Sequence, residues 1–180
     1  MLQIKEEFDA LLQYAKGKKL ILEIGTAWGG TLCRFIEVAD DSAEIVSIDM
    51  PGGKYGGKFG QPSIDLMMSW AKPNQKLHII RADSHAPETV ENVRKILNGR
   101  KFDFIFIDGD HSYGGVKKDY ENYKDMANDI IAFHDITNHF FVIPGEEIEV
   151  DKFWHELRGN KTEIIKDKNQ GRCGIGVLKI

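Results

Sequence analysis

The stretch LILEIGTAWGGT, residues 20–31, decides the fold of this chain. It begins with a short apolar run, which is typical of a strand that is buried on both faces. Gly25, Gly29 and Gly30 then remove side chains from the turn that follows, so a ligand can approach the backbone and the N–H groups of a helix start. Apolar residues at helical spacing continue the pattern to Ala39. The stretch therefore predicts a strand, a bare loop and a helix.

The same pairing of an apolar run with a helical pattern recurs along the chain. The further runs lie at residues 44–48, 77–80, 102–107 and 129–133. Five such units in succession predict a parallel, doubly wound sheet.

The last part of the chain follows a different pattern. After a helix near residues 150–157, two strands are expected at residues 162–165 and 174–180, with only a turn between them. Such a pair must be antiparallel, because parallel strands need a long crossover. We therefore expect an α/β fold with one mostly parallel, seven-stranded sheet and an antiparallel C-terminal hairpin.

The composition indicates one globular domain that spans residues 1–180, because this length leaves no room for a second full core. The formal net charge of −4 argues against a nucleic-acid partner, which needs a basic face. No signal peptide and no apolar run of about 20 residues is visible, so we expect a cytoplasmic protein without a membrane partner. Cys33 and Cys173 are too few and too far apart in sequence to indicate a disulfide framework or a zinc site, and a single disulfide between them is the alternative. The oligomeric state is left open, and a homo-oligomer is among the choices.

Four acidic residues are expected at one edge of the sheet: Asp49, Asp83, Asp108 and Asp135. Ligands of open α/β sheets bind beyond the carboxyl ends of the strands, near the point where the strand order reverses. A single Asp at such a place is usually a helix cap or a turn residue. Four together repel one another, which favours a cationic ligand or one rich in hydrogen-bond donors.

The loop at residues 25–30, which we call the glycine loop, argues against two classes of ligand. It lacks the middle glycine of the G-x-G-x-x-G motif and the Lys of a P-loop, which argues against a dinucleotide or a nucleoside triphosphate. Asp49 lies 24 residues after Gly25, at the tip of the second strand, where an acid accepts hydrogen bonds from ribose hydroxyls. A tight turn that binds no ligand is the alternative.

Several motifs together resemble those of class I S-adenosylmethionine-dependent methyltransferases. The pattern Glu-x-Gly-x-x-x-Gly-Gly at residues 23–30, with Asp49, is similar to their cofactor motifs. FIDGDHSY at residues 106–113 and VKKD at residues 116–119 resemble the group that contains bacterial small-molecule O-methyltransferases and cephalosporin-hydroxylase-like proteins. The pattern is completed by AFHDI at residues 132–136 and GIGV at residues 174–177. This resemblance implies a Rossmann-like methyltransferase fold.

The resemblance also implies which residues bind S-adenosylmethionine. The glycine loop holds the methionine part, the acid at the tip of the second strand holds the ribose, and the turn after the third strand lies near the adenine. The acids after the fourth strand line the methyl side of the pocket. The implied cofactor residues are Glu23, Gly25, Thr26, Gly29, Asp49, Asp83, Ser84, Asp108 and Asp110. Trp28 is expected to pack beneath the loop.

A divalent cation is implied by the catechol-type members, which ligate it after the fourth and fifth strands. The corresponding residues here are Asp108, His134 and Asp135. Oxygen-rich sites suit Mg²⁺, whereas an imidazole shifts the preference toward Mn²⁺, Fe²⁺ or Zn²⁺. His134 therefore leaves the metal and its presence open, with a hydrogen bond to backbone as the alternative role. His111 is expected to act as a general base or a metal ligand, and it forms the predicted catalytic pair with Asp108.

The predicted function is O-methylation of a hydroxylated small molecule, with or without a divalent cation. An alternative from a different class is a non-catalytic or accessory nucleotide-binding module of the same fold. A sugar-nucleotide transferase is a third hypothesis, but the glycine loop lacks a phosphate-binding Arg or Lys. The loops at residues 50–61 and 138–149 are candidates for substrate specificity, or else ordinary surface loops.

Overall fold

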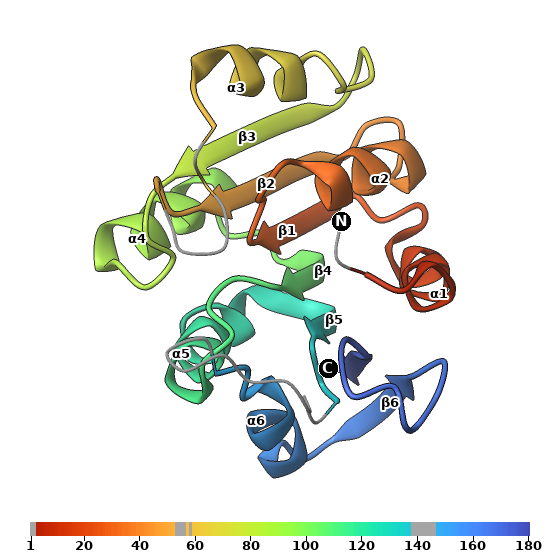
Figure 1. Cartoon of the computed structure of the whole chain (residues 1–180). Helices are drawn as coiled ribbons and strands as arrows, with labels where there is room; N and C mark the ends of the chain where they lie inside the picture. The colour runs from red at the N-terminus through yellow and green to blue at the C-terminus, as the bar shows by residue number, and fades with distance from the viewer. Residues whose placement is uncertain (1–2, 53–56, 58, 138–146) are drawn as a thin grey trace.

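A computed structural model of the chain describes residues 3–52, 57, 59–137 and 147–180. It contains a seven-stranded sheet with the strand order β3-β2-β1-β4-β5-β7-β6 (Figure 1). The strands are β1 (Leu20–Ile24), β2 (Glu44–Asp49), β3 (Lys76–Arg81), β4 (Phe102–Ile107), β5 (Ala127–His134), β6 (Asn160–Ile164) and β7 (Ile175–Lys179). The helices are α1 (Lys5–Ala15), α2 (Gly30–Val38), α3 (Gln61–Met68), α4 (Pro87–Leu97), α5 (Tyr113–Tyr123), the short η1 (Lys124–Met126) and α6 (Val150–Glu156). The predicted α/β sheet is therefore confirmed.

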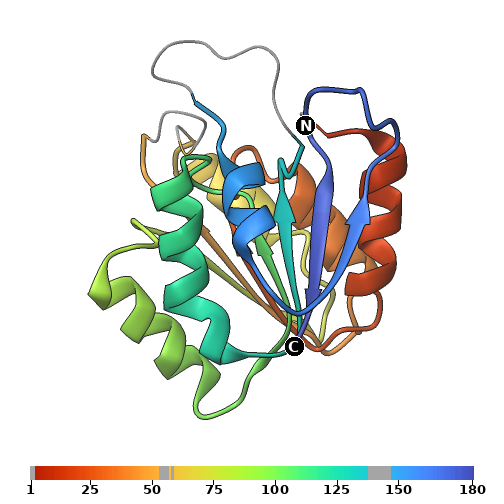
Figure 2. The same ribbon diagram turned by 90° about the horizontal axis from the view of Figure 1, so that it is seen from below.

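Helices cover both faces of the sheet, so the structure has three layers (Figures 1 and 2). On one face α1, α2 and α3 pack around Phe35, whose ring centroid lies 5.4 Å from that of Phe104 and 5.6 Å from that of Phe106. On the other face α4, α5 and α6 pack around Phe133 and Trp154. Strands that are buried on both faces need apolar residues at successive positions, which explains the continuous apolar runs.

The strand order reverses at the centre of the sheet, where β1 pairs in parallel with both β2 and β4. The pairing continues past the strand ends, because the amide of Gly25 donates to the carbonyl of Ile48 and the amide of Asp108 donates to the carbonyl of Ile24, both at 2.8 Å. A Cβ on Gly25 would lie 2.0 Å from the carbonyl oxygen of Asp108, and the φ of Gly25 is +100°. Only glycine tolerates both conditions. The glycine loop and the end of β4 are therefore fixed against each other.

The C-terminal hairpin is antiparallel as predicted, but its strands are not joined by a short turn. β7 pairs antiparallel with both β5 and β6, and residues 165–174 connect β6 to β7. The carboxylate of Glu7, which is 1% exposed, organises this connection. It accepts hydrogen bonds from the amides of Lys166 (2.9 Å) and Gly174 (3.0 Å) and from the side chain of Gln170 (2.7 Å). A side chain of α1 thus supplies the acceptors that a tight turn would supply locally.

Two further predictions concern membrane crossing and the two cysteines. Within the described ranges, no helix combines the length and the apolar character that crossing a membrane requires. Cys33 lies on α2 and Cys173 lies just before β7, and the two do not form a disulfide with each other. The disulfide alternative is therefore wrong.

The contacts of Glu7 predict a large effect of a single substitution. Glu7→Ala leaves three donors of the β6–β7 connection without their buried acceptor, so we expect the free energy of unfolding to fall by about 3 kcal/mol. Urea unfolding followed by circular dichroism measures this loss. Glu6→Ala is the matched control, because the side chain of Glu6 is exposed and pairs with the exposed Lys166, so its loss should change stability by less than about 0.5 kcal/mol. Equal effects of the two variants would contradict the structural role of Glu7.

Candidate functional site

The carboxyl ends of the strands bring together some, but not all, of the predicted acids. β2 ends at Asp49, while Asp108 and Asp135 directly follow β4 and β5. Asp83 stands apart, since its side chain is 52% exposed and its Oδ1 accepts a hydrogen bond from the amide of His85 (2.8 Å). The four acids therefore do not form one cluster, and Asp83 acts as a turn residue in this structure.

Asp49 is bound to the glycine loop. Its Oδ2 accepts a hydrogen bond from the amide of Ala27 at 2.5 Å. Burial raises the pKa of Asp49, while hydrogen bonds from the amides of Ala27 and Thr26 act in the opposite direction. Gly57 lies against the same carboxylate, because a Cβ on Gly57 would come within 2.3 Å of Oδ1. Arg81 donates to the carbonyl of Gly57 (2.7 Å), which connects Gly57 to the end of β3.

Thr26 and Trp28 occupy opposite positions in the glycine loop. Thr26 is 2% exposed, and its hydroxyl lies 2.6 Å from that of Ser47 on β2. Trp28 is 71% exposed, so the expectation that it packs beneath the loop is wrong. The small side chain of Thr26 occupies the buried side of the loop instead. Gly29 precedes the first residue of α2 with a φ of +78°, a conformation that favours glycine.

Glu23 is a fully buried acid behind the loop. Its Oε2 accepts a hydrogen bond from the hydroxyl of Ser47 (2.5 Å), and its Oε1 has no hydrogen-bond partner within the described part of the chain. Burial raises the pKa of Glu23 to about 8, the charges of Asp108 and Asp49 add to the rise, and the Ser47 hydrogen bond opposes it. Glu23 is therefore mainly protonated at neutral pH and can donate a hydrogen bond.

Asp108, His111, His134 and Asp135 lie together at the ends of β4 and β5, and we call these four residues the His–Asp cluster. Nδ1 of His111 is 2.7 Å from Oδ2 of Asp135. Nδ1 of His134 is 3.2 Å from Oδ1 of Asp108 and 3.3 Å from Oδ1 of Asp135. Burial disfavours protonation of both imidazoles, but the two carboxylates outweigh it and raise the pKa of each, that of His134 well above its ordinary value. The cluster therefore attracts positive charge.

Two sets of donor atoms around the His–Asp cluster could hold a metal ion. The first set is one atom each of Asp108, His111 and Asp135, which lie within 4.8 Å of one another. The second set meets the same limit and consists of His134, Asp135 and Cys173. The sequence predicts Asp108, His134 and Asp135 as ligands. Neither set contains all three, because Asp108 belongs to the first set, His134 to the second and Asp135 to both, with His111 and Cys173 as the added donors.

Ser84 binds a buried acid, Asp119, to which the sequence analysis assigns no role. Its hydroxyl donates to Asp119 (2.6 Å), which is fully buried. Nε2 of His85 is 3.3 Å from the same carboxylate, and the hydroxyl of Tyr123 donates to the carbonyl of Ser84 (2.9 Å). A signal was present in the sequence, because Val116, Asp119 and Tyr123 share one helical stripe. An acid on a buried stripe needs buried partners.

Asp110 and Asp108 make different contacts, although the resemblance implies that both line the methyl side of the cofactor pocket. Asp110 is exposed, and its Oδ1 accepts a hydrogen bond from the amide of Ser112 (2.9 Å) at the start of α5. Oδ2 of Asp108 accepts a hydrogen bond from the side chain of Gln3, which also donates to the hydroxyl of Thr31, both at 3.4 Å. Sequence reasoning missed Gln3, because nothing in its local pattern indicates a contact with the end of β4.

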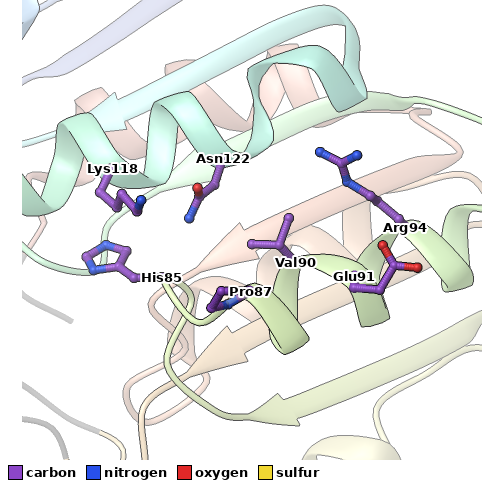
Figure 3. Close-up of a pocket in the computed structure, with 7 residues that line it drawn as sticks. All are labelled: His85, Pro87, Val90, Glu91, Arg94, Lys118 and Asn122. Atoms are coloured by element: carbon purple, nitrogen blue, oxygen red, sulfur yellow. The ribbon is translucent and has the colours of Figure 1, made fainter.

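A shallow pocket of about 260 Å³ lies between α4 and α5 (Figure 3). Its lining residues are His85, Pro87, Val90, Glu91, Arg94, Lys118 and Asn122. His85 and Lys118 lie near one end of the pocket and Arg94 lies near the other. Most of the lining comes from helices and none of it from the residues assigned to the cofactor, so this pocket adds nothing to the site at the sheet edge. Of the two loops proposed to supply specificity, residues 53–56, 58 and 138–146 lie outside the described residues.

Comparisons with known proteins agree with this geometry. A family described as a methyltransferase domain matches residues 22–136. Among curated proteins, protein y4gI of Sinorhizobium fredii is 25% identical over an alignment of 158 residues, and the match covers 83% of this chain. The chain spans only 16% of the length of that relative.

Solved structures show the same fold at low sequence identity. The O-methyltransferase from Bacillus cereus in complex with S-adenosylhomocysteine has a TM-score of 0.65 and 18% identity, and the match covers 98% of this chain and 80% of that one. The N-methyltransferase NodS from Bradyrhizobium japonicum, also in complex with S-adenosylhomocysteine, has a TM-score of 0.60 and 12% identity, with coverage of 97% and 86%. These matches confirm the Rossmann-like methyltransferase fold.

The family match covers the part of the chain that carries the sheet-edge geometry. It runs from β1 to the residue after Asp135, and it includes the glycine loop, Asp49 and the whole His–Asp cluster. It also covers more than half of the chain. The chain therefore belongs to this family of methyltransferase domains.

Proposed function

We propose that this chain is an S-adenosylmethionine-dependent methyltransferase that methylates a hydroxyl oxygen of a small molecule. The hydrogen bond from the amide of Ala27 to Asp49 is the main support for this proposal, because it fixes an acid at the end of β2 against the glycine loop. An acid at this position of an open α/β sheet is suited to ribose hydroxyls. The family match and the S-adenosylhomocysteine that is bound in similar structures support the same choice of cofactor. A cytoplasmic location stays a prediction.

We assign parts of the cofactor to segments of the sheet edge. The amides at the start of α2 suit the carboxylate of the methionine part, because a helix N-terminus attracts anions. The buried Asp119 supports the assignment of the adenine to the turn after β3, since it holds Ser84 in place. The proposed cofactor residues are Glu23, Gly25, Thr26, Gly29, Asp49, Asp83, Ser84, Asp108 and Asp110.

The chain's own residues supply the proton chemistry. Bound S-adenosylmethionine supplies a methyl carbon that is electrophilic because it is attached to a positively charged sulfur. Asp135 lies 2.7 Å from Nδ1 of His111 and orients its ring, and we assign the imidazole as the base that accepts the proton of the acceptor hydroxyl. Asp108, 3.2 Å from His134, keeps negative charge beside the reacting groups. This charge favours the cationic sulfonium and the protonated His111.

The donor atoms of the His–Asp cluster fit a divalent cation. Asp108, His111 and Asp135 would hold it, since their donor atoms already lie within 4.8 Å of one another. A cation at this place would lower the pKa of the acceptor hydroxyl and orient its oxygen. Two carboxylates in one small cluster also repel each other, and this repulsion would be relieved by a positive ion. His111 takes part with or without the cation, so it is the residue to test.

The cofactor assignment predicts the effect of Asp49→Asn. Loss of the charged acceptor should weaken the binding of S-adenosylhomocysteine at least about tenfold, the equivalent of about 1.4 kcal/mol. Isothermal titration calorimetry measures the affinity. Asp41→Asn is the matched control, since Asp41 is 87% exposed and pairs only with Lys72 in the described contacts. An unmodified protein that does not bind S-adenosylhomocysteine at millimolar concentration would overturn the proposed function.

The role of His111 predicts a loss of turnover without a loss of cofactor binding. His111→Gln should lower the rate of methyl transfer by about a hundredfold, because a general base contributes at least that factor. The rate is measured as S-adenosylhomocysteine production with a panel of catechols, sugars and other hydroxylated compounds. His155→Gln, at an exposed position, is the control and should keep the rate. Tight cofactor binding with no turnover on any compound would favour the accessory-module alternative instead.

Glu23 predicts a dependence of stability on pH. Its pKa is about 8 in the folded chain and 4.5 in the absence of structure, so between these values the folded state binds the extra proton. The stability that Glu23 contributes is complete below pH 4.5 and is lost as the pH rises toward 8, by at most about 1.4 kcal/mol per pH unit. Urea unfolding at about pH 5 and about pH 8 should therefore show a smaller decrease for Glu23→Gln than for the unmodified protein. The exposed Glu37→Gln is the control, and identical decreases in all three proteins would contradict the raised pKa.

A further inference from the structure

We infer that His134, Asp135 and Cys173 form a binding site for a thiophilic divalent cation of the zinc class. This site adjoins the oxygen-rich set of the His–Asp cluster but contains a thiol, which no motif in the sequence indicates. The inference concerns metal binding rather than methyl transfer. It can therefore be tested without a methyl acceptor.

The fold brings the three donors together through the pairing of β5 with β7. β5 ends at His134, and Cys173 lies two residues before the first residue of β7. The chain after β5 stays paired with the segment that holds Cys173, because both the amide (3.1 Å) and the hydroxyl (2.9 Å) of Thr137 donate to the carbonyl of Cys173. One ligand atom from each of His134, Asp135 and Cys173 lies within 4.8 Å of the other two, and all three residues are buried.

His134 is the residue that indicates a ligand. Its side chain is 5% exposed, and Nδ1 forms ion pairs with the carboxylates of Asp108 (3.2 Å) and Asp135 (3.3 Å). Nε2, however, is buried and has no hydrogen-bond partner among the residues that the structure describes. Buried polar groups without hydrogen bonds are rare, and an ion is one of their ordinary explanations. A neutral imidazole is the most common protein ligand for a metal.

The donor types select the class of metal. Mg²⁺ requires oxygen ligands and keeps water around it, whereas a thiolate with an imidazole selects zinc-like ions. Three protein ligands leave the fourth position of a tetrahedral zinc ion open to water or to another ligand. On binding, the Sγ–H bond of Cys173 and one N–H bond of the His134 imidazolium break, bonds from the sulfur and from that nitrogen to the metal form, and both protons pass to the solvent. No oxidant or reductant is needed.

Asp135 links this site to the proposed base. Its Oδ1 faces His134 and its Oδ2 faces His111, so one carboxylate belongs to both donor sets. A cation bound between His134 and Cys173 therefore fixes the carboxylate that orients His111. Fixing a ligand from its far side is an ordinary function of residues around metal centres.

The loop that carries Cys173 is held independently of any metal. Glu7 accepts a hydrogen bond from the amide of Gly174 (3.0 Å), next to the cysteine. Asp135 and Cys173 adopt φ angles of +61° and +57°, which are uncommon for residues other than glycine and persist only where the surroundings impose them. The donors are therefore positioned by the fold before a cation binds.

The experiment uses the full chain after removal of metals with a chelator. Co²⁺ is titrated in and the thiolate-to-cobalt charge-transfer absorption is recorded, and Zn²⁺ and Mg²⁺ are then added as competitors. We expect an equimolar amount of Co²⁺ to produce the thiolate band, Zn²⁺ to abolish it and Mg²⁺ to leave it unchanged. Cys173→Ser should remove the band and weaken Zn²⁺ binding at least about tenfold, whereas Cys33→Ser, the matched control on α2, should change neither.

Two results would overturn the inference. One is a spectrum of the unmodified protein without a thiolate band at saturating Co²⁺, a result that does not depend on the folding of any variant. The other is a Cys173→Ser protein that is folded and binds Zn²⁺ as tightly as the unmodified protein. Calorimetry with S-adenosylhomocysteine on the same metal-free sample reports separately on the proposed function, so the failure of one proposal is distinguishable from the failure of the other.

Discussion

The close approach of Gly25 to the carbonyl oxygen of Asp108 is the constraint on which the rest of the site depends. Any side chain at position 25 would collide with the backbone at the end of β4, because its Cβ would lie 2.0 Å from that oxygen. Backbone hydrogen bonds past the ends of β1 and β4 maintain the contact. The glycine loop, which binds Asp49, and the His–Asp cluster are therefore held at neighbouring strand ends by one short-range steric fit.

Much of the fold could be predicted because its signals are local. Continuous apolar runs identify strands that are buried on both faces, and an acid at the end of a run marks the carboxyl edge. The features that the sequence does not indicate are mainly contacts between distant parts of the chain. Glu7 and the β6–β7 connection are far apart in sequence, and Cys173 joins the end of β5 only through the pairing with β7. Trp28 was placed wrongly because the loop sequence does not show that Thr26 occupies the buried side.

The candidate site illustrates how a fold accommodates buried charge. Glu23 lies in a position where ionisation is unfavourable, and it has a hydroxyl partner and no cation among its described contacts. The carboxylates of Asp108 and Asp135 instead face two imidazoles, which can carry the compensating charge. The buried acids near this sheet edge therefore have their charge compensated in different ways because their partners differ. Their positions at strand ends are readable from sequence, but these partners are not.

The exposure of Trp28 gives the chain a natural optical reporter. The side chain of Trp28 is largely exposed to water at the glycine loop, whereas that of Trp154 is fully buried in the core on the side of α4, α5 and α6. The emission of an indole shifts when water around it is displaced, so an event at the loop changes the fluorescence of Trp28 and of Trp70, which lies beside Gly29, while that of Trp154 serves as an internal reference. The binding of a ligand at the glycine loop, which follows β1, can thus be monitored in real time without attaching a dye.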